Sequence, residues 1–514
     1  MDSALDKKIF RKKIFIVVSI TFILGLVSFI AVHVNKANVK YKNELNKITI
    51  SAQRWGKDNI DKLPKNHDEV YYLSLETLIN DKYYKRGSVK TPITNKKIDA
   101  CISIAYDTIA HKYHYNLSET YCKDYKYTVY KDKSGANTPI LSDNMVPVIY
   151  KDDKWVKADI TKRWYDYTNN EWANMVLVRE NGKNSREYYL SEDSINKEVL
   201  MDDILAFYVW VPRFKYQLWN VNGDVEDFKS INVIFEYENA TTGLGTKNGE
   251  WLTHPAFCLG NVGDDRTECS ESEVNGLWVG KFETTGDNRM PTVLPNENPI
   301  TTYNLSTDYT LVRKMISNNY GLTSKNYLHI MKNMDWGAVV YLTYSKYGYN
   351  TEPFINNNSN LVTGCSASSP TSNAYEGCLY QYNSVVGVKA STTGNITGIY
   401  DMNGGASEIV MGVLLNGKGR EYKGASKFKS NISKSLYNGY DDASYESGML
   451  GDATKEFTYN GKSTKGTAVL FVSAKQPWFI RGGFYDSGYE AGITSYSSSD
   501  GDYSNAFRTA LVGY

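Results

Sequence analysis

The chain has 514 residues and a formal net charge of +1 at pH 7. Its length allows about two to four domains with cores of their own, and its balanced charge gives no overall bias toward nucleic acid or acidic substrates. The sequence contains 42 tyrosines, a residue type that suits both β-strands and exposed recognition surfaces.

The N-terminal end predicts a membrane anchor. Residues 1–13 contain five Lys and Arg side chains, and the 21 residues of 14–34 contain no Asp, Glu, Lys or Arg. Such a run is long enough to cross the hydrocarbon core as a helix, and no small-residue cleavage site follows it. We therefore expect a cytoplasmic basic segment 1–13, an uncleaved transmembrane helix 14–34 and a single-pass cell-membrane protein whose bulk is extracellular.

Residues 35–124 show a helical period and then a small α/β pattern. Before Pro64, five residues at steps of 4, 3, 4 and 3 share one helix face: Tyr41, Leu45, Ile48, Ala52 and Trp55. A long helix followed by a small domain is similar to the layout of type IV pilins and pseudopilins, which implies assembly with pilin-like subunits. The prepilin processing signature, a Gly before Phe-Thr-Leu-Ile-Glu, is missing, so a plain anchor with a helical stalk is the alternative.

Residues 125–199 predict a β-rich spacer module. The runs VPVIYKDDKWVKADI and WYDYTNNEWANMVLV alternate or are β-branched, and Asp/Asn clusters interrupt them. Trp155, Trp164 and Trp172 recur at spacings of nine and eight. An exposed sugar-stacking face is one interpretation of this spacing, but we expect a small sheet that buries its tryptophans.

Residues 200–514 alternate short strand-like runs, Gly/Asn/Ser loops and a few helical stretches without a βαβ rhythm. This pattern predicts an irregular α+β domain with an aromatic core and a surface of loops. For the whole chain we therefore expect an α+β fold: an anchor helix that continues into a stalk or pilin-like domain, a β-rich module and a large C-terminal domain.

The six cysteines form three close pairs along the chain. Six cysteines allow 15 pairings, but this clustering favours sequential pairing. No C-x-x-C motif occurs, so zinc or thioredoxin-like chemistry is not indicated, and disulfides formed in an oxidising exterior are expected instead. The predicted bridges are Cys101–Cys122, Cys258–Cys269 and Cys365–Cys378.

Five stretches in the last 300 residues carry a resemblance to a known family. They are FYVWVPRFKY (207–216), LWVGKFETT (277–285), MKNMDWGAVVYLTYSKYG (331–348), NITGIYDMNGGASEIVMG (395–412), and IRGG (480–483) with the closing Phe507-Arg508. The domain resembles the formylglycine-generating-enzyme, or sulfatase-modifying-factor, branch of the C-type lectin fold. The motif residues in register are Asn395, Gly398, Asp401, Met402, Gly404, Glu408, Arg481, Gly482, Gly483, Phe507 and Arg508.

The departures from this family bear on activity. The family's oxidases work through a reactive cysteine pair late in the domain, but residues 379–514 contain no cysteine. Ser and Tyr cannot replace a thiolate nucleophile or a copper ligand. We therefore do not expect this chain to be an enzyme, and we predict no catalytic residues. We expect no cofactor, although Asp401 and Glu408 are candidate calcium ligands because such loops supply oxygen ligands.

Other chemistry is weakly indicated. His111 and His114 form H-x-x-H in a strand-like run, where residues i and i+3 point to opposite faces. The sequence contains no G-x-S-x-G, Walker loop or H-E-x-x-H motif. No basic stripe interleaved with aromatics appears, so nucleic acid is not an expected partner.

The segment between Arg481-Gly482-Gly483 and Phe507-Arg508 is rich in Tyr, Ser, Gly and Asp. The resembled fold includes ligand-binding variants diversified by retroelements, whose variable residues lie between the same two motifs, and this palette suits recognition. We expect a surface that binds an extracellular protein or glycan; a formylglycine-generating-type enzyme and a pilus or type II secretion component are the alternatives. The predicted ligand-binding residues are Phe484, Tyr485, Asp486, Tyr489, Thr494, Tyr496, Ser498, Asp500 and Asp502.

Overall fold

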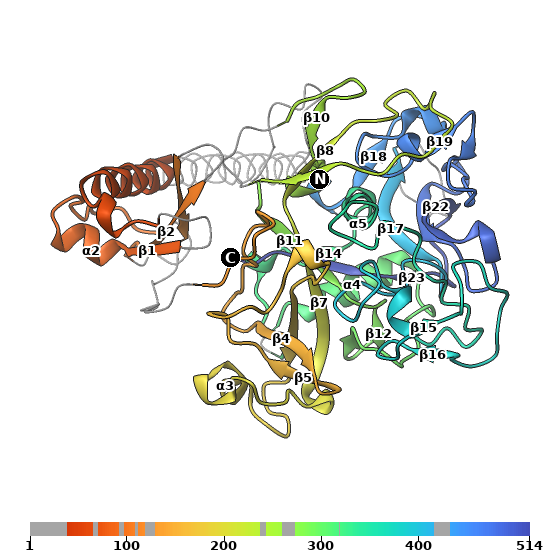
Figure 1. Cartoon of the computed structure of the whole chain (residues 1–514), viewed down its shortest axis with the longest axis horizontal. Coiled ribbons are helices and arrows are strands. Elements are labelled where there is room, and N and C mark those ends of the chain that lie inside the picture. The colour runs from red at the N-terminus through yellow and green to blue at the C-terminus, as the bar shows by residue number, and fades with distance from the viewer. Residues whose placement is uncertain are drawn as a thin grey trace, which may run out of the picture. The chain divides into compact units, whose positions relative to one another are not determined.

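A computed structural model of the chain divides it into two compact units, Met1–Thr128 and Val129–Tyr514 (Figure 1). The residues that the structure describes are 39–64, 70–91, 97–107, 112–118, 129–236, 243–259, 273–317, 319–415 and 432–513.

The first unit combines a helix with an antiparallel sheet. Residues 39–58 are helical, and the sheet has the order β1-β2-β3. On the predicted helix face, Tyr41, Ile48, Ala52 and Trp55 are buried and Leu45 packs against them, which confirms the helical period. The other elements are β1 (Val70–Ser74), α2 (Leu75–Asn80), β2 (Cys101–Asp107) and β3 (Lys112–Ser118).

A seven-stranded antiparallel sheet runs through the core of the second unit. Its order is β14-β24-β11-β7-β6-β4-β5, and every residue of the central β7 is buried because neighbouring strands and packed elements cover both of its faces. The strands are β4 (Val146–Lys151), β5 (Lys154–Lys157), β6 (Asn174–Val178), β7 (Ile204–Pro212), β11 (Gly276–Gly280), β14 (His329–Ile330) and β24 (Thr509–Leu511).

A five-stranded sheet carries the C-terminal motifs. Its order is β18-β17-β21-β22, with β23 pairing β17 in parallel. Helix α5 (Asn333–Thr343) is buried on all sides and packs against β7 of the first sheet and β17 of the second. The strands are β17 (Glu408–Leu414), β18 (Asn438–Tyr440), β21 (Trp478–Gly482), β22 (Gly492–Ser499) and β23 (Ala506–Phe507).

Short elements complete the second unit. One small sheet has the order β10-β8-β9, and three two-stranded ladders pair β12 with β13, β15 with β16, and β19 with β20. Their bounds, with those of two helices, are α3 (Arg186–Leu190), β8 (Phe214–Gln217), β9 (Val233–Phe235), β10 (Trp251–Thr253), β12 (Thr285–Gly286), β13 (Pro291–Thr292), α4 (Leu305–Met315), β15 (Cys365–Ser366), β16 (Tyr380–Gln381), β19 (Thr458–Tyr459) and β20 (Lys462–Ser463).

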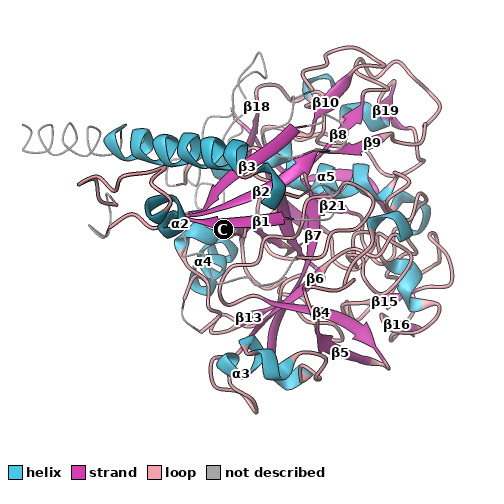
Figure 2. Ribbon diagram, turned by 60° about the vertical axis from the view of Figure 1, so that its left-hand side comes forward, coloured by secondary structure: helices cyan, strands magenta, loops and turns pink. Residues whose placement is uncertain are grey.

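The predicted fold class is wrong. Among the described residues the structure is mostly β-sheet, and helices make up 21%. Figure 2 shows the strands and helices in different colours. Short strand-like runs pair with partners far away in the chain, as when β11 pairs with β24. The helical share is therefore too small for the expected α+β architecture.

The predicted membrane localisation is also corrected. In the part of the chain that the structure describes, no helix is both long and apolar enough to cross a membrane. Segments 1–13 and 14–34, on which the single-pass prediction rested, lie outside the described residues.

The segment 125–199 does not form a separate module. Its strand β6 pairs directly with β7, so β4, β5 and β6 belong to the same sheet as β11 and β24. Trp155, Trp164 and Trp172 are buried in this shared core, which confirms that the sheet buries its tryptophans. The division after Thr128 is the one that the structure makes.

Candidate functional site

Arg508 closes the core of the second unit through a buried ion pair with Glu408. Arg508 Nε donates to Glu408 Oε2 at 3.0 Å, and the guanidinium also donates to the carbonyl oxygens of Gly280 (2.8 Å) and Tyr400 (2.9 Å). The two charged side chains are at most 1% exposed. Because β23, which contains Phe507, pairs with β17, both main chain and charge fix this end of the C-terminal segment.

Two more carboxyl groups, those of Glu283 and Asp401, lie in the same buried cluster. Asp401 accepts hydrogen bonds from the Gly364 amide at 3.0 Å and from Asn356 Nδ2 at 2.8 Å, and Glu283 accepts one from the Ala406 amide at 3.1 Å. Burial, and then the negative charges of the neighbouring carboxylates, raise the pKa of Glu283 well above its ordinary value. Three carboxyl groups thus face one guanidinium.

Asp401 and Glu408 are the residues for which calcium binding was predicted. Both are buried, and their oxygens accept the hydrogen bonds described above. Across the described ranges, no group of three or more His, Cys, Asp or Glu side chains is arranged to hold a metal ion. These two carboxylates stabilise the fold through their hydrogen bonds. Calcium binding stays a prediction.

The Arg481-Gly482-Gly483 corner fixes the other end of the C-terminal segment. Arg481 is buried and donates to the carbonyl oxygen of Ala453 at 3.1 Å. Gly482 and Gly483 have φ angles of 84° and 77°, and a Cβ on Gly483 would lie 2.6 Å from Cα of Ala491. Glycine is needed at this corner because a side chain has neither the backbone freedom nor the space.

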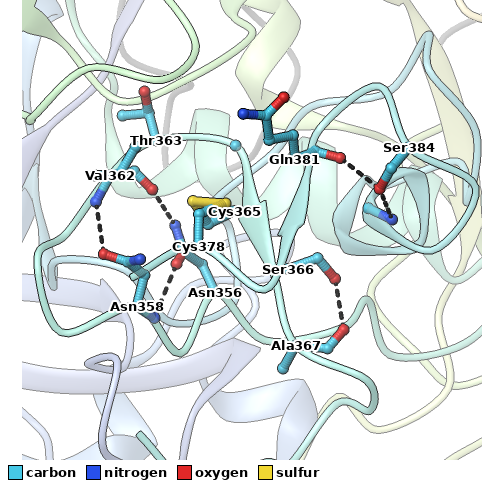
Figure 3. Close-up of a disulfide and its surroundings, with 12 residues drawn as sticks. Asn356, Asn358, Val362, Thr363, Cys365, Ser366, Ala367, Cys378, Gln381 and Ser384 are labelled. Atoms are coloured by element: carbon cyan, nitrogen blue, oxygen red, sulfur yellow. Dashed lines mark hydrogen bonds between the residues drawn. A yellow bond between two sulfur atoms is a disulfide. The ribbon is translucent and has the colours of Figure 1, made fainter. Parts of the chain in front are cut away.

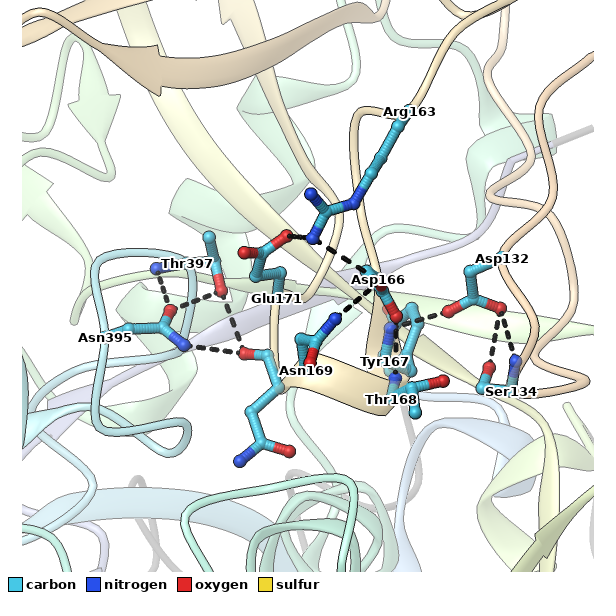
Figure 4. A network of polar contacts seen from close by, with 11 residues as sticks. Asp132, Ser134, Arg163, Asp166, Tyr167, Thr168, Asn169, Glu171, Asn395 and Thr397 are labelled. Carbon is cyan, nitrogen blue, oxygen red and sulfur yellow. Dashed lines mark hydrogen bonds and ion pairs between the residues drawn. The ribbon is translucent and has the colours of Figure 1, made fainter.

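The remaining motif residues lie in the turns before β17. Asn395 Nδ2 donates to the carbonyl oxygen of Asn170 at 2.8 Å and ties these turns to the segment before β6 (Figure 4). Met402 is buried, and a Cβ on Gly404 would lie 2.4 Å from Cγ1 of Ile355. These residues therefore shape the frame of the domain rather than an exposed site.

Lys281 is a buried cation that makes no ion pair within the described part of the chain. Its Nζ donates to Asn174 Oδ1 (2.8 Å) and to the carbonyl oxygens of Ile396 (2.6 Å) and Gly398 (2.8 Å), and it lies 5.2 Å from the centroid of the Trp155 ring. Burial lowers the pKa of Lys281 well below its ordinary value. The side chain joins β6, β11 and the turns before β17.

Replacing Lys281 with methionine is expected to destabilise the second unit by about 3 kcal/mol or more, because the change removes the donor from two buried acceptors and one part-buried acceptor. Urea denaturation of the whole chain, followed by tryptophan fluorescence, measures the loss. The control is Lys162→Met, since the Lys162 side chain is 76% exposed and should contribute less than about 1 kcal/mol. Equal losses in the two variants would contradict the role assigned to Lys281.

The predicted disulfide Cys365–Cys378 is confirmed, with the two Cα atoms 5.3 Å apart (Figure 3). Cys101 and Cys258 are also disulfide-bonded. Their predicted partners, Cys122 and Cys269, lie outside the described residues, so these two pairings stay predictions. His111 of the H-x-x-H pair lies outside them as well, and His114 is buried in β3.

Three of the predicted ligand-binding residues are buried in β22. Thr494 is fully buried and Ser498 is 8% exposed. Tyr496 is 2% exposed, its hydroxyl lies 2.8 Å from Thr458 Oγ1, and burial raises its pKa to about 12. The backbone of Leu470 also hydrogen-bonds to Tyr496 from the side opposite β21. These three side chains are therefore removed from the candidate surface.

The other predicted residues lie in two loops. Phe484 and Tyr485 are half-buried with ring centroids 4.5 Å apart, whereas Asp486 and Tyr489 are exposed, Tyr489 to 68%. The Tyr485 amide donates to the carbonyl oxygen of Gly405 at 2.9 Å and holds this loop on the frame. We call residues 484–490 the aromatic loop.

Asp500 and Asp502 lie in the second loop and are half-buried. Asp500 Oδ1 accepts a hydrogen bond from the Asp502 amide at 3.1 Å, and the Leu305 amide donates to the carbonyl oxygen of Gly501 at 3.2 Å. Asp500 thus stabilises its own turn next to the start of α4. The aromatic loop is the better candidate for recognition, because it presents rings together with a carboxylate.

No protein-family model and no curated protein matches this chain. The assignment of a site therefore depends on geometry.

Sequence reasoning missed a neighbouring exposed residue, Tyr375, which is 48% exposed in the loop closed by Cys365–Cys378. Its position outside the C-terminal segment kept it from the predicted set. The signal was nonetheless present, since residues 347–388 and 482–507 both contain tyrosines and neither contains a Lys or Arg.

Proposed function

We propose that this chain is a ligand-binding protein whose recognition surface includes the aromatic loop. The observation that carries the proposal is that the loop is exposed while both ends of its segment are fixed by buried arginines, Arg481 and Arg508. A fixed backbone reduces the entropy that a loop loses on binding, and tyrosine supplies a large contact area with few rotors.

The resemblance to the sulfatase-modifying-factor branch of the C-type lectin fold supports the same proposal. The residues that carry the resemblance are those of the buried frame, and the segment between its two ends corresponds to the variable segment of the diversified ligand-binding variants. The ligand class that the resemblance favours is a protein or a glycan.

The test is binding to protein and glycan arrays by the whole chain and by Tyr489→Ala. The substitution is expected to weaken binding at least about tenfold, since exposed tyrosines that enter an interface are frequent hot spots. The control is Tyr188→Ala, because Tyr188 is also exposed (36%) but lies on α3. Unchanged binding by Tyr489→Ala, or an equal loss in the control, would remove the aromatic loop from the site.

A further inference from the structure

The disulfide loop, which we define as residues 365–378, lies against the aromatic loop. Ile355, Ala367 and Ala491 pack together as a small buried cluster, and a Cβ on Gly488 would lie 3.9 Å from the carbonyl oxygen of Thr371. The two loops come from distant parts of the sequence, but these contacts place them side by side.

The disulfide loop presents its tyrosine from a fixed backbone. The Tyr375 amide donates to the carbonyl oxygen of Asn357, and the Ser359 amide donates to the carbonyl oxygen of Tyr375, both at 2.9 Å. The covalent bridge between Cys365 and Cys378 closes the loop (Figure 3). Tyr375 is 48% exposed, so its ring is available at a position that two hydrogen bonds hold.

All charged side chains of the disulfide loop and the aromatic loop are acidic. Glu376, Asp486 and Glu490 are exposed, and within the described ranges none of them forms an ion pair with a Lys or Arg. Residues 347–388 and 482–507, which contain both loops, include no basic side chain. Exposed tyrosines beside carboxylates that lack a basic partner attract cations, through the negative face of the ring and through charge-assisted hydrogen bonds.

We infer that the disulfide loop and the aromatic loop form one recognition surface, and that it takes a Lys- or Arg-bearing segment of a protein ligand. This inference rests on the proposed ligand-binding function. The tyrosine rings supply contact area for the ligand's aliphatic and cationic groups, and Glu376, Asp486 and Glu490 neutralise its charge. A neutral glycan would donate hydroxyl hydrogen bonds to these carboxylates but would not neutralise their charge.

The predicted preference for a cationic ligand is tested with two peptide libraries. One carries Lys and Arg, and the matched library carries Gln in place of each cation. The whole chain is expected to bind the cationic library more tightly, with an affinity that falls as salt rises. The double variant Glu376→Gln/Asp486→Asn should lose at least about tenfold in affinity and much of the salt dependence. The control Glu192→Gln/Asp193→Asn neutralises two exposed acidic residues elsewhere and should change neither.

The participation of the disulfide loop in this surface is tested by Tyr375→Ala. This change should weaken binding of the same peptides several-fold, whereas Tyr188→Ala should not. Binding lost in Tyr489→Ala but unchanged in Tyr375→Ala would confine the surface to the aromatic loop. Salt-independent binding to a protein or glycan, unaffected by the double neutralisation, would overturn the cationic ligand and leave the proposed function standing. Absence of binding to every array and library would overturn both.

Discussion

Replacing Arg508 with methionine is expected to destabilise the second unit by about 3–5 kcal/mol, because breaking a buried ion pair leaves an uncompensated charge in the core. Glu408 would lose its cationic partner, and the nearby Asp401 would add to the unbalanced negative charge. Urea denaturation followed by tryptophan fluorescence measures the effect, since nine of the ten tryptophans lie in residues 129–514.

The matched control is Arg163→Met. Arg163 also forms an ion pair, with Glu171 at 2.6 Å, but its side chain is 53% exposed. Solvent screens such a pair, so its loss should amount to less than about 1 kcal/mol. A similar loss of unfolding free energy in Arg163→Met and Arg508→Met would contradict this prediction. It would show that burial does not determine how much the Arg508–Glu408 pair contributes to stability.

Replacing Asp308 with asparagine is expected to remove a large part of the pH dependence of stability. Asp308 is 2% exposed in α4, and its Oδ1 has no hydrogen-bond partner among the described residues. Burial raises the pKa of Asp308 from 3.8 to about 8. The folded state therefore keeps a proton that the unfolded state releases above pH 3.8.

The sign of this effect follows from proton linkage. Between about pH 4 and 8 the folded state binds the extra proton, so the free energy of unfolding should fall by about 1.4 kcal/mol per pH unit because of Asp308. The stabilising contribution is complete below pH 3.8 and is lost as the pH rises through about 8. An asparagine side chain does not titrate, so the variant should be more stable than the natural chain at alkaline pH.

The measurement is the free energy of unfolding at a series of pH values for the natural chain, Asp308→Asn and the control Asp193→Asn. Asp193 is exposed, so its replacement should leave the slope unchanged. Identical slopes for the natural chain and Asp308→Asn would mean that Asp308 is ionised in the folded state and would contradict the prediction.

Local spacing in the sequence predicted several features correctly. The steps between Tyr41 and Trp55 match a helix whose face is buried, because 3.6 residues per turn bring these side chains to one side. The close pair Cys365 and Cys378 forms the expected bridge.

Composition misled where burial depends on distant partners. The residues of β22, including Thr494, Tyr496 and Ser498, are small or polar and resemble an exposed surface. They are nevertheless buried, because β21 pairs with one edge of β22 and the segment around Leu470 hydrogen-bonds to the other. No local pattern in the sequence of β22 predicts that these segments lie beside it.

The extent of the second unit shows the same limit. Alternating runs in residues 125–199 predicted strands correctly, but not the strands with which they pair. β6 joins β7 directly, so a segment that looks independent in the sequence belongs to the central sheet. The overall share of strand was likewise underestimated, because isolated apolar runs of about three to five residues become strands only when a partner is present.

By itself, the sequence determined the features that depend on a few neighbouring residues: the buried helix face of the first unit and the Cys365–Cys378 bridge. Only the tertiary structure decided which tyrosines are exposed, that Asp401 and Glu408 join a buried cluster with Arg508, and that Tyr375 lies in a loop beside the aromatic loop. The physical reason is that exposure and charge pairing depend on chain segments that lie close together in space. Those segments are tens to hundreds of residues apart in the sequence.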